Sequence, residues 1–376
     1  MNKKLKVLPV LAMGLMLVAC NGTGTSSSTK PTSKNDEVNF TLKVGSYVAL
    51  GSNANQIEVS TAAVILKEDK IVDAYFDVLQ APFKIESTSD KKTEKVTYTV
   101  SLDTTTNQTK DAGDKVIETK QELKTRYGMA STAAEGEWNV QAANFAKYTV
   151  GKTIDEVTSK NYKSHYNKDG TEVVAGCSIS QKNFTTALKV ITDTKTFKAP
   201  AGKVSAGLGY KVSTLSDNVL TVTLAGSATD KDGKIYETSI NAYQIPVTVD
   251  GSSVTSPKIA IDTSKKQATV ANFKDHTVAS GENTYYTSVL SKRELKELYA
   301  MKENNEDAQK MEWYNQANNF AKYAKGKIAS EIAGKTYKSN HNANGTVEVP
   351  GCTITMEDFA VAIGKSATNK SGLTAK

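Results

Sequence analysis

The residues best placed to do chemistry lie in two matching segments, 169–180 and 344–355. Each begins with an Asp-Gly or Asn-Gly turn, continues through a short strand pattern, and reaches a Gly-Cys pair followed by a hydroxyl side chain. The small Gly-Cys pair would let a second backbone or a ligand come close. The shared positions are Asp169 and Asn344, Gly176 and Gly351, Cys177 and Cys352, and Ser178 and Thr353.

The hydroxyls of Ser178 and Thr353 are the candidate attachment points. Ser180 and Thr355 are predicted to be N-caps of a following helix, with Asp358 completing a box-like pattern in the second segment. Ser178 and Thr353 would then stand just ahead of a helix N-terminus, where free N–H groups and the helix dipole favour a phosphate. The alternative is a turn whose hydroxyl only satisfies backbone donors.

Both segments belong to a longer internal duplication. Residues 137–152 align with residues 312–327, and residues 161–180 align without gaps with residues 336–355. A weaker match lies upstream of each block. The duplication predicts two tandem homologous domains, 38–197 and 198–370.

Each repeat opens with alternating β-branched segments and continues with helical periodicity. In segment 138–148, for example, apolar side chains recur three and four residues apart on one face. Strands followed by helices favour an α+β fold with an antiparallel sheet in each repeat. The predicted strands are 56–66, 70–79, 95–102, 218–225, 234–249 and 258–261, and the predicted helices are 122–129, 138–148, 181–191, 294–301, 313–323 and 356–363.

The N-terminus is typical of a secreted, lipid-anchored protein. Residues 2–6 carry three lysines, residues 7–18 are apolar, and the sequence Leu-Val-Ala-Cys ends at Cys20. The apolar run is too short to span a bilayer, which favours a cleaved signal peptide over residues 1–20. Its last four residues resemble a bacterial lipobox, which implies lipidation of Cys20. Residues 21–37, rich in Ser, Thr, Gly and Lys, are predicted to be a flexible tether.

Composition argues against several classes of function. The formal net charge of +7 comes almost entirely from lysine, and Arg126 and Arg293 are the only arginines. A nucleic-acid partner is therefore not expected, because arginine is the residue favoured at base and phosphate contacts. The cysteine and histidine spacing is not that of a zinc or haem site, so no metal is expected. The sequence also lacks a dinucleotide-binding fingerprint.

The two motif segments resemble the flavinylation motif of FMN-binding domains, in which an FMN transferase joins the FMN phosphate to a Ser or Thr hydroxyl as a phosphodiester. The resemblance implies two covalent FMN groups, on Ser178 and Thr353. It also implies that Gly176 and Gly351 are the motif glycines and that Asp169 and Asn344 lead the motif. The sequence departs from the motif at its alanine, which is replaced by Cys177 and Cys352.

Together with the lipobox and tether, these motifs resemble the family of flavinylated, pheromone-encoding lipoproteins of Gram-positive extracellular electron transfer. The resemblance implies a carrier on the outer face of the cell membrane rather than a substrate-specific enzyme. Such a carrier takes electrons from a membrane quinol-linked system and passes them to extracellular acceptors such as ferric iron or free flavins. The signal peptide would be a possible source of a peptide pheromone.

Two other functions are compatible with the sequence. A non-redox binding or adhesion lipoprotein would use its duplicated domains to hold a ligand, and would be colourless. A flavin-dependent reductase would have a substrate pocket of its own and turn over a defined small molecule. A carrier, in contrast, would react broadly with one-electron acceptors.

Other residues repeated in both halves have two interpretations each. Tyr162 and Tyr337 coincide and could contact the flavin, with core packing as the alternative. Trp138 and Trp313 also coincide and are predicted to be core residues.

The remaining reactive side chains are not expected to form a catalytic group. Free, buried thiols are predicted for Cys177 and Cys352, because a disulfide would need close, facing geometry between the repeats. The three histidines, His165, His276 and His341, do not occupy equivalent positions and are predicted to be solvated loop residues.

Overall fold

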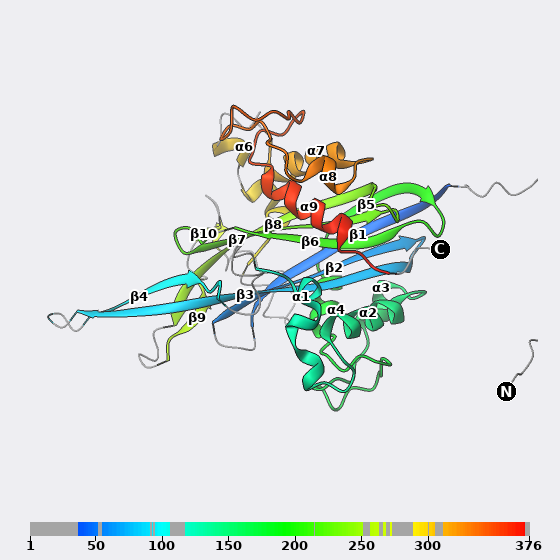
Figure 1. The fold of residues 1–376 in the computed structure, drawn as a ribbon, viewed down its shortest axis with the longest axis horizontal. Coiled ribbons are helices and arrows are strands. Elements are labelled where there is room, and N and C mark those ends of the chain that lie inside the picture. The colour runs from blue at the N-terminus through cyan, green and yellow to red at the C-terminus, as the bar shows by residue number, and fades with distance from the viewer. Residues whose placement is uncertain are drawn as a thin grey trace, which may run out of the picture. The chain divides into compact units, whose positions relative to one another are not determined.

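The computed structural model has an α+β fold with two main antiparallel sheets, as the order of the predicted elements indicated (Figure 1). None of the helices in the described part of the chain is long and apolar enough to cross a membrane. The predicted signal peptide, Cys20, nearly all of the tether and His276 lie outside the described residues. The structure describes residues 37–51, 55–90, 92, 95–105, 117–213, 215–250, 256–262, 266–267, 271–272, 289–299, 301–304 and 311–372.

Each repeat supplies one of the main sheets. The strand order is β4-β3-β2-β1-β5 in the first repeat and β6-β7-β8-β9 in the second, and all neighbouring strands are antiparallel. The strands of the first sheet are β1 (Glu37–Leu50), β2 (Gln56–Lys67), β3 (Lys70–Asp90), β4 (Lys95–Leu102) and β5 (Ile191–Pro200). Those of the second are β6 (Ser205–Val212), β7 (Val219–Thr229), β8 (Ile235–Asp250) and β9 (Lys258–Ile261), and β10 (Lys266–Gln267) pairs separately with β11 (Ala271–Asn272).

The two sheets share one hydrophobic core. Side chains on a strand alternate between faces, and in β2 Ile57 and Val59 join this shared core whereas Ala62 and Val64 face the helices. The second repeat contributes residues such as Leu208 to the shared core. Residues Asn35–Lys376 accordingly form one compact unit, and the predicted boundary between 197 and 198 falls within β5, an edge strand of the first sheet.

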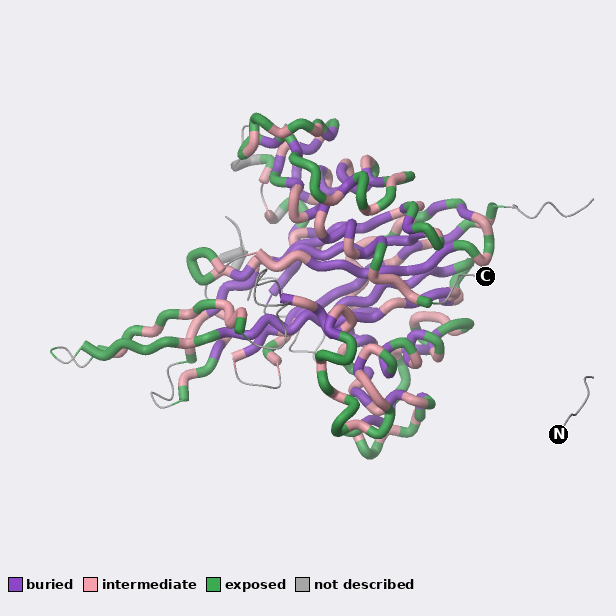
Figure 2. Tube along the Cα trace, in the orientation of Figure 1, coloured by how far each residue is buried: buried purple, intermediate pink, exposed green. Residues whose placement is uncertain are grey.

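Helices cover the other face of each sheet (Figure 1). In the first repeat, Trp138 of α2 (Trp138–Thr149) packs edge-on against Phe184 of α4 (Lys182–Lys189), with ring centroids 5.6 Å apart. In the second, the ring centroids of Trp313 of α7 (Trp313–Ala324) and Phe359 of α9 (Glu357–Thr368) are 5.5 Å apart in the same geometry. The prediction that both tryptophans are core residues is confirmed. Figure 2 shows buried residues concentrated in the strands, while the outer end of the β3–β4 hairpin is exposed.

The longer helices agree with the helices predicted from the sequence, whereas two of the shorter predicted helices differ. The predicted helices 122–129 and 294–301 are instead single helical turns that continue as 3-10 turns. The reason lies at Lys124 and Lys296, which adopt positive φ angles of 50° and 46° and break the α-helical path. The helical elements are α1 (Lys120–Leu123), η1 (Lys124–Tyr127), η2 (Met129–Ser131), α2 (Trp138–Thr149), α3 (Ile154–Thr158), α4 (Lys182–Lys189), α5 (Lys292–Leu295), η5 (Lys296–Tyr299), α6 (Met301–Asn304), α7 (Trp313–Ala324), α8 (Ala329–Ile332) and α9 (Glu357–Thr368).

Candidate functional site

The hydroxyl of Ser178 is held against helix α2 by one glutamine. Ser178 lies on the loop between α3 and α4, half-buried, and its Oγ donates to Oε1 of Gln141 at 3.2 Å. The same amide oxygen accepts the backbone N–H groups of Ser178 at 2.8 Å and Ile179 at 3.1 Å. Gln141 is fully buried, and its Nε2 donates to the carbonyl of Gly136 at 2.9 Å. Both ends of this amide are therefore fixed.

The second repeat builds the same arrangement around Thr353. Its Oγ1 donates to Oε1 of Gln316 on α7 at 3.3 Å. That oxygen also accepts the N–H groups of Thr353 at 2.8 Å and Ile354 at 3.3 Å. We call each set of glutamine, hydroxyl and two N–H groups a glutamine cradle. Since the two cradles agree, the geometry is a property of the repeat.

The motif glycines bring the loop close to the same helices. Gly176 and Gly351 have φ angles of 67° and 70°, which favour glycine. Nδ2 of Asn144 donates to the Gly176 carbonyl at 2.8 Å, and Nδ2 of Asn319 donates to the Gly351 carbonyl at 2.7 Å. A Cβ on Gly176 would come within 2.5 Å of Asn144 Nδ2. The predicted close approach at the Gly-Cys pair is thus made by an asparagine of the same repeat.

The leading Asp169 and Asn344 are exposed on turns, away from any described interaction with the hydroxyls. The position after Asp169 requires a glycine, because a Cβ on Gly170 would lie 2.2 Å from the carbonyl oxygen of Tyr162. Gly345 meets the backbone of Tyr337 in the same way.

Tyr162 and Tyr337 occupy the core. Their exposed fractions are 6% and 0%, and their hydroxyls donate to the carbonyls of Val157 and Ile332, both at 2.8 Å. The Tyr162 ring packs edge-on against Phe145. The structure therefore favours the core interpretation, because buried rings offer no free face for stacking.

The cysteines of the motif are buried free thiols, as predicted. Burial raises the pKa of Cys177 to about 11 and that of Cys352 to about 12, so both remain protonated at neutral pH. Each belongs to the hydrophobic cluster of its own repeat.

The predicted N-caps are wrong. Helices α4 and α9 begin after Gln181 and Met356, and no side chain caps either N-terminus, so Ser180 and Thr355 stand outside the cap position. Asp358 accepts a hydrogen bond from Ser213 at 2.8 Å and forms no box. The N–H groups at Ser178 are already taken by the glutamine cradle.

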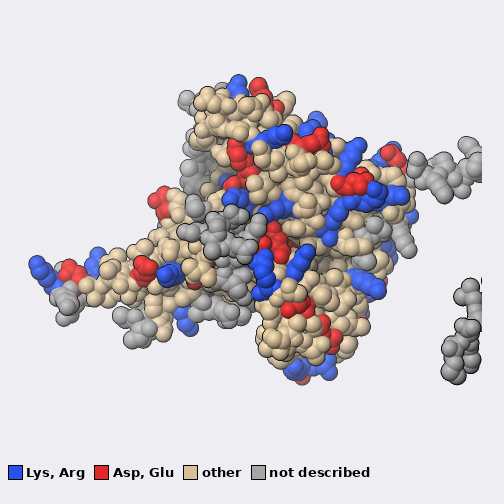
Figure 3. Space-filling view, in the orientation of Figure 1, with Lys and Arg blue, Asp and Glu red and all other residues tan. Residues whose placement is uncertain are grey.

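The charged residues near the two hydroxyls differ. Helix α4 begins with Lys182, whereas α9 begins with Glu357 and Asp358. The exposed His165 donates its backbone N–H to the Ser178 carbonyl at 2.7 Å, and Asn340 occupies that position beside Thr353. Figure 3 shows acidic and basic side chains interspersed on the face in view.

The residues that the sequence analysis missed are Gln141, Gln316, Asn144 and Asn319. The sequence did point to them, because the same polar residues recur at equivalent positions of the two helices. The described residues contain no cluster of three or more His, Cys, Asp or Glu side chains that could hold a metal ion. Comparison with protein-family models, curated proteins and solved structures found no match for this chain.

Proposed function

We propose that Ser178 and Thr353 are attachment points for FMN and that the protein is a membrane-anchored extracellular electron carrier. The observation that carries this proposal is the glutamine cradle, built identically around both hydroxyls. In the alternative of a purely structural turn, the serine hydroxyl would accept the loop N–H groups. Here Gln141 performs that task, and the Ser178 hydroxyl only donates to it.

The residues around the hydroxyls fit a phosphodiester. Ser178 and Thr353 are half-buried loop residues, which a transferase can approach more readily than residues of the core. The transferase would use an activated flavin donor, such as a flavin dinucleotide: the hydroxyl oxygen bonds to the phosphorus of the FMN half, the phosphoanhydride bond of the donor breaks, and the nucleoside monophosphate leaves together with the hydroxyl proton. The protein gains the mass of FMN less one water. When bound, FMN supplies the redox chemistry, while the chain supplies attachment and surroundings. Electron transfer from a membrane quinol-linked donor to extracellular acceptors is the role that the motif resemblance supports.

The first experiment is peptide mass spectrometry with a visible spectrum of the mature protein, produced together with an FMN transferase. We expect yellow protein and one FMN less a water on each peptide that contains Ser178 or Thr353. The variants Ser178→Ala and Thr353→Ala should each lose one flavin, and the double variant should be colourless with an unchanged unfolding midpoint. The matched controls are Ser180→Ala and Thr355→Ala, which should keep both flavins.

The carrier function is tested by reducing the purified protein and mixing it with ferric citrate. Flavin reoxidation without a requirement for one defined substrate supports a carrier. A flavin that reoxidises only with one small molecule indicates a reductase. A colourless protein in the presence of an active transferase contradicts the proposal and leaves the binding lipoprotein.

A further inference from the structure

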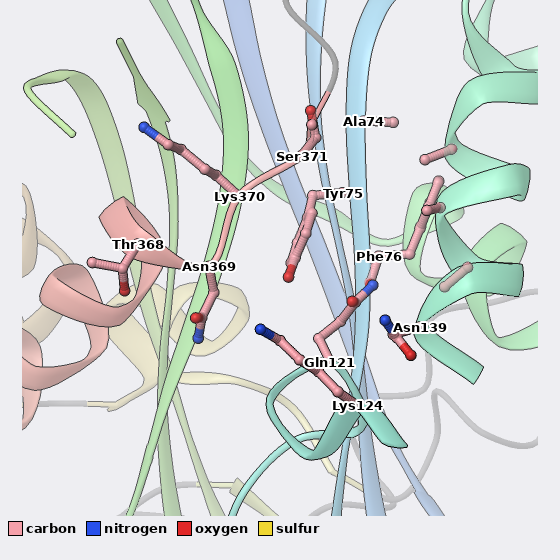
Figure 4. Close-up of a pocket in the computed structure, with 14 residues that line it drawn as sticks. Ala74, Tyr75, Phe76, Gln121, Lys124, Asn139, Thr368, Asn369, Lys370 and Ser371 are labelled. Carbon is pink, nitrogen blue, oxygen red and sulfur yellow. The ribbon is translucent and has the colours of Figure 1, made fainter. Parts of the chain in front are cut away.

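A pocket of about 260 Å³ lies where the two repeats meet, and we call it the seam pocket (Figure 4). Its walls come from β3, from α1 and the turn after it, from one face of α2, and from the end of α9 with the chain that follows it. Phe76 and the small side chains Ala142, Ala143 and Ala146 form its apolar wall. Its polar lining includes Tyr75, Gln121, Lys124, Asn139 and Asn369.

The duplication provides an internal comparison for this pocket. The strand registers make Tyr75 the counterpart of Ser239. Gln121 is the counterpart of Arg293, because each side chain donates to the equivalent carbonyl of the neighbouring strand, that of Phe76 or Ile240. The two halves of the seam can therefore be compared residue by residue.

At the corresponding place in the second repeat, long polar side chains bind one another and Asp193 of β5. Arg293 is buried, with its guanidinium 3.2 Å from the carboxylate of Asp193 and donating to Oδ1 of Asn318 at 3.0 Å. Ser239 also donates to Asp193, at 2.7 Å. In the first repeat the shorter Gln121 and the small Ala143 stand at the Arg293 and Asn318 positions. The first repeat therefore has shorter side chains than Arg293 and Asn318 beside its open volume.

The charge on the lining of the seam pocket favours an anion. None of the described residues that line it is acidic, and Figure 4 shows the Lys124 side chain reaching toward the C-terminal segment. Lys370 points away, and its ammonium donates to backbone carbonyls, including that of Lys231 at 3.0 Å. The nearby Glu122 carboxylate is 2.8 Å from the ammonium of Lys365 and accepts a hydrogen bond from Asn369. Lys124 is thus the cation left to meet a ligand.

Neutral donors complete the polar side of the pocket. Burial, and then the neighbouring Asp77 and Glu122, raise the pKa of Tyr75 well above its usual value. Its hydroxyl therefore stays protonated, and Figure 4 shows it directed toward Asn369 and Gln121. Asn139 adds an amide from the first turn of α2.

We propose that the seam pocket binds a small organic carboxylate. Its charged end would meet Lys124, Tyr75 and Asn139, and its apolar body would lie on the alanine face of α2. This site is separate from the candidate flavin attachment, because Gln141 and Asn144 project from a different face of α2. The proposal therefore does not depend on flavinylation.

The test uses benzoate as the probe and benzamide as its uncharged analogue, with binding measured by calorimetry on the mature protein. We expect benzoate to bind with a Kd of about 1 mM or tighter, and benzamide about tenfold more weakly. Lys124→Met should weaken benzoate binding about tenfold. The matched control is Lys296→Met, which removes the equivalent lysine of the filled half and should leave benzoate binding unchanged.

A second variant tests the volume of the pocket. Ala143→Phe should abolish benzoate binding, because the larger side chain fills the pocket at its apolar wall. Ala143→Asn, which introduces the residue that the second repeat uses, should weaken benzoate binding and serves as the test if the phenylalanine variant does not fold. The unfolding midpoint and the flavin content report the integrity of each variant. The proposal is overturned if benzoate does not bind at about 10 mM. It is also overturned if the folded Ala143 and Lys124 variants bind benzoate like the parent.

Discussion

The amide oxygen of Gln141 accepts the backbone N–H of Ser178 at 2.8 Å across 37 residues of chain, and Gln316 does the same for Thr353 at the same distance and separation. In each repeat the glutamine thereby connects a helix to a distant loop, alongside the asparagine that binds the Gly176 or Gly351 carbonyl. The position of each candidate attachment hydroxyl depends on that glutamine.

Replacement of the glutamine should act on one site only. In Gln141→Leu the N–H groups of Ser178 and Ile179 lose their acceptor, which costs about 1–3 kcal/mol and lets the loop move. We expect peptide mass spectra to show less flavin on Ser178 and full loading of Thr353. Gln316→Leu should give the reverse pattern. Equal loading of both sites in both variants would contradict a positioning role.

The motif glycine can be compared with a glycine in open space. Gly151 has a φ of 84° and no neighbour within 4 Å of an added Cβ, so Gly151→Ala should cost only the roughly 1 kcal/mol of an unfavourable φ. Gly176→Ala adds a collision with Asn144, so we expect a further loss of about 1–3 kcal/mol in the free energy of unfolding. Urea denaturation measures both. Equal losses would show that the close contact is unimportant.

A buried carboxyl group on β3 should make stability depend on pH. Burial raises the pKa of Asp77 to about 8, so the folded protein holds a proton that the unfolded chain releases above its ordinary pKa near 3.8. This contribution is complete at low pH and is lost as pH rises through about 8, by up to about 1.4 kcal/mol per pH unit. Asp73, whose pKa is raised to about 7, acts in the same direction.

The second repeat suggests which substitution to test at Asp77, because Asn241 occupies the equivalent position. Its Oδ1 accepts the N–H groups of Ala242 and Arg293, as Oδ1 of Asp77 accepts those of Val78 and Gln121. Asp77→Asn should therefore be more stable than the parent near pH 8 and lose that advantage near pH 5. Urea unfolding at the two pH values provides the measurement. The same difference in the free energy of unfolding between variant and parent at both pH values would rule out titration of Asp77.

The motif thiols should resist alkylation until the protein unfolds. Burial raises the pKa of both cysteines, so little thiolate forms at neutral pH. We expect iodoacetamide to leave Cys177 and Cys352 unmodified in the native protein and to label both in urea without a reductant. Rapid labelling of the native protein would contradict their burial, and failure to label in urea would indicate a disulfide.

Sequence periodicity predicted the elements that bury one regular face. The helix around Trp138 is an example, since its apolar spacing is visible along the chain. Gln141 was overlooked because an apolar pattern does not reveal a buried polar residue whose partner lies 37 residues away. The cap at Ser180 was wrong because Gln181 is already in the helical region, so the helix starts after it.

The shared core was also beyond the sequence analysis. A duplication predicts two similar sheets, but their relative placement depends on which strand faces remain uncovered. The clue was strand β2, in which Ala62, Ala63, Val64 and Ile65 are all buried. A run of this kind indicates a strand covered on both sides, by helices on one and by the other repeat on the other.

The core between the two sheets resembles the interface of a homodimer whose subunits have been joined end to end. In isolation, each repeat would expose the apolar sheet face that it contributes to this core, so burial of that face would require association with a second repeat. Fusion into one chain makes that association intramolecular. Because the two halves belong to one chain, they remain paired at any dilution.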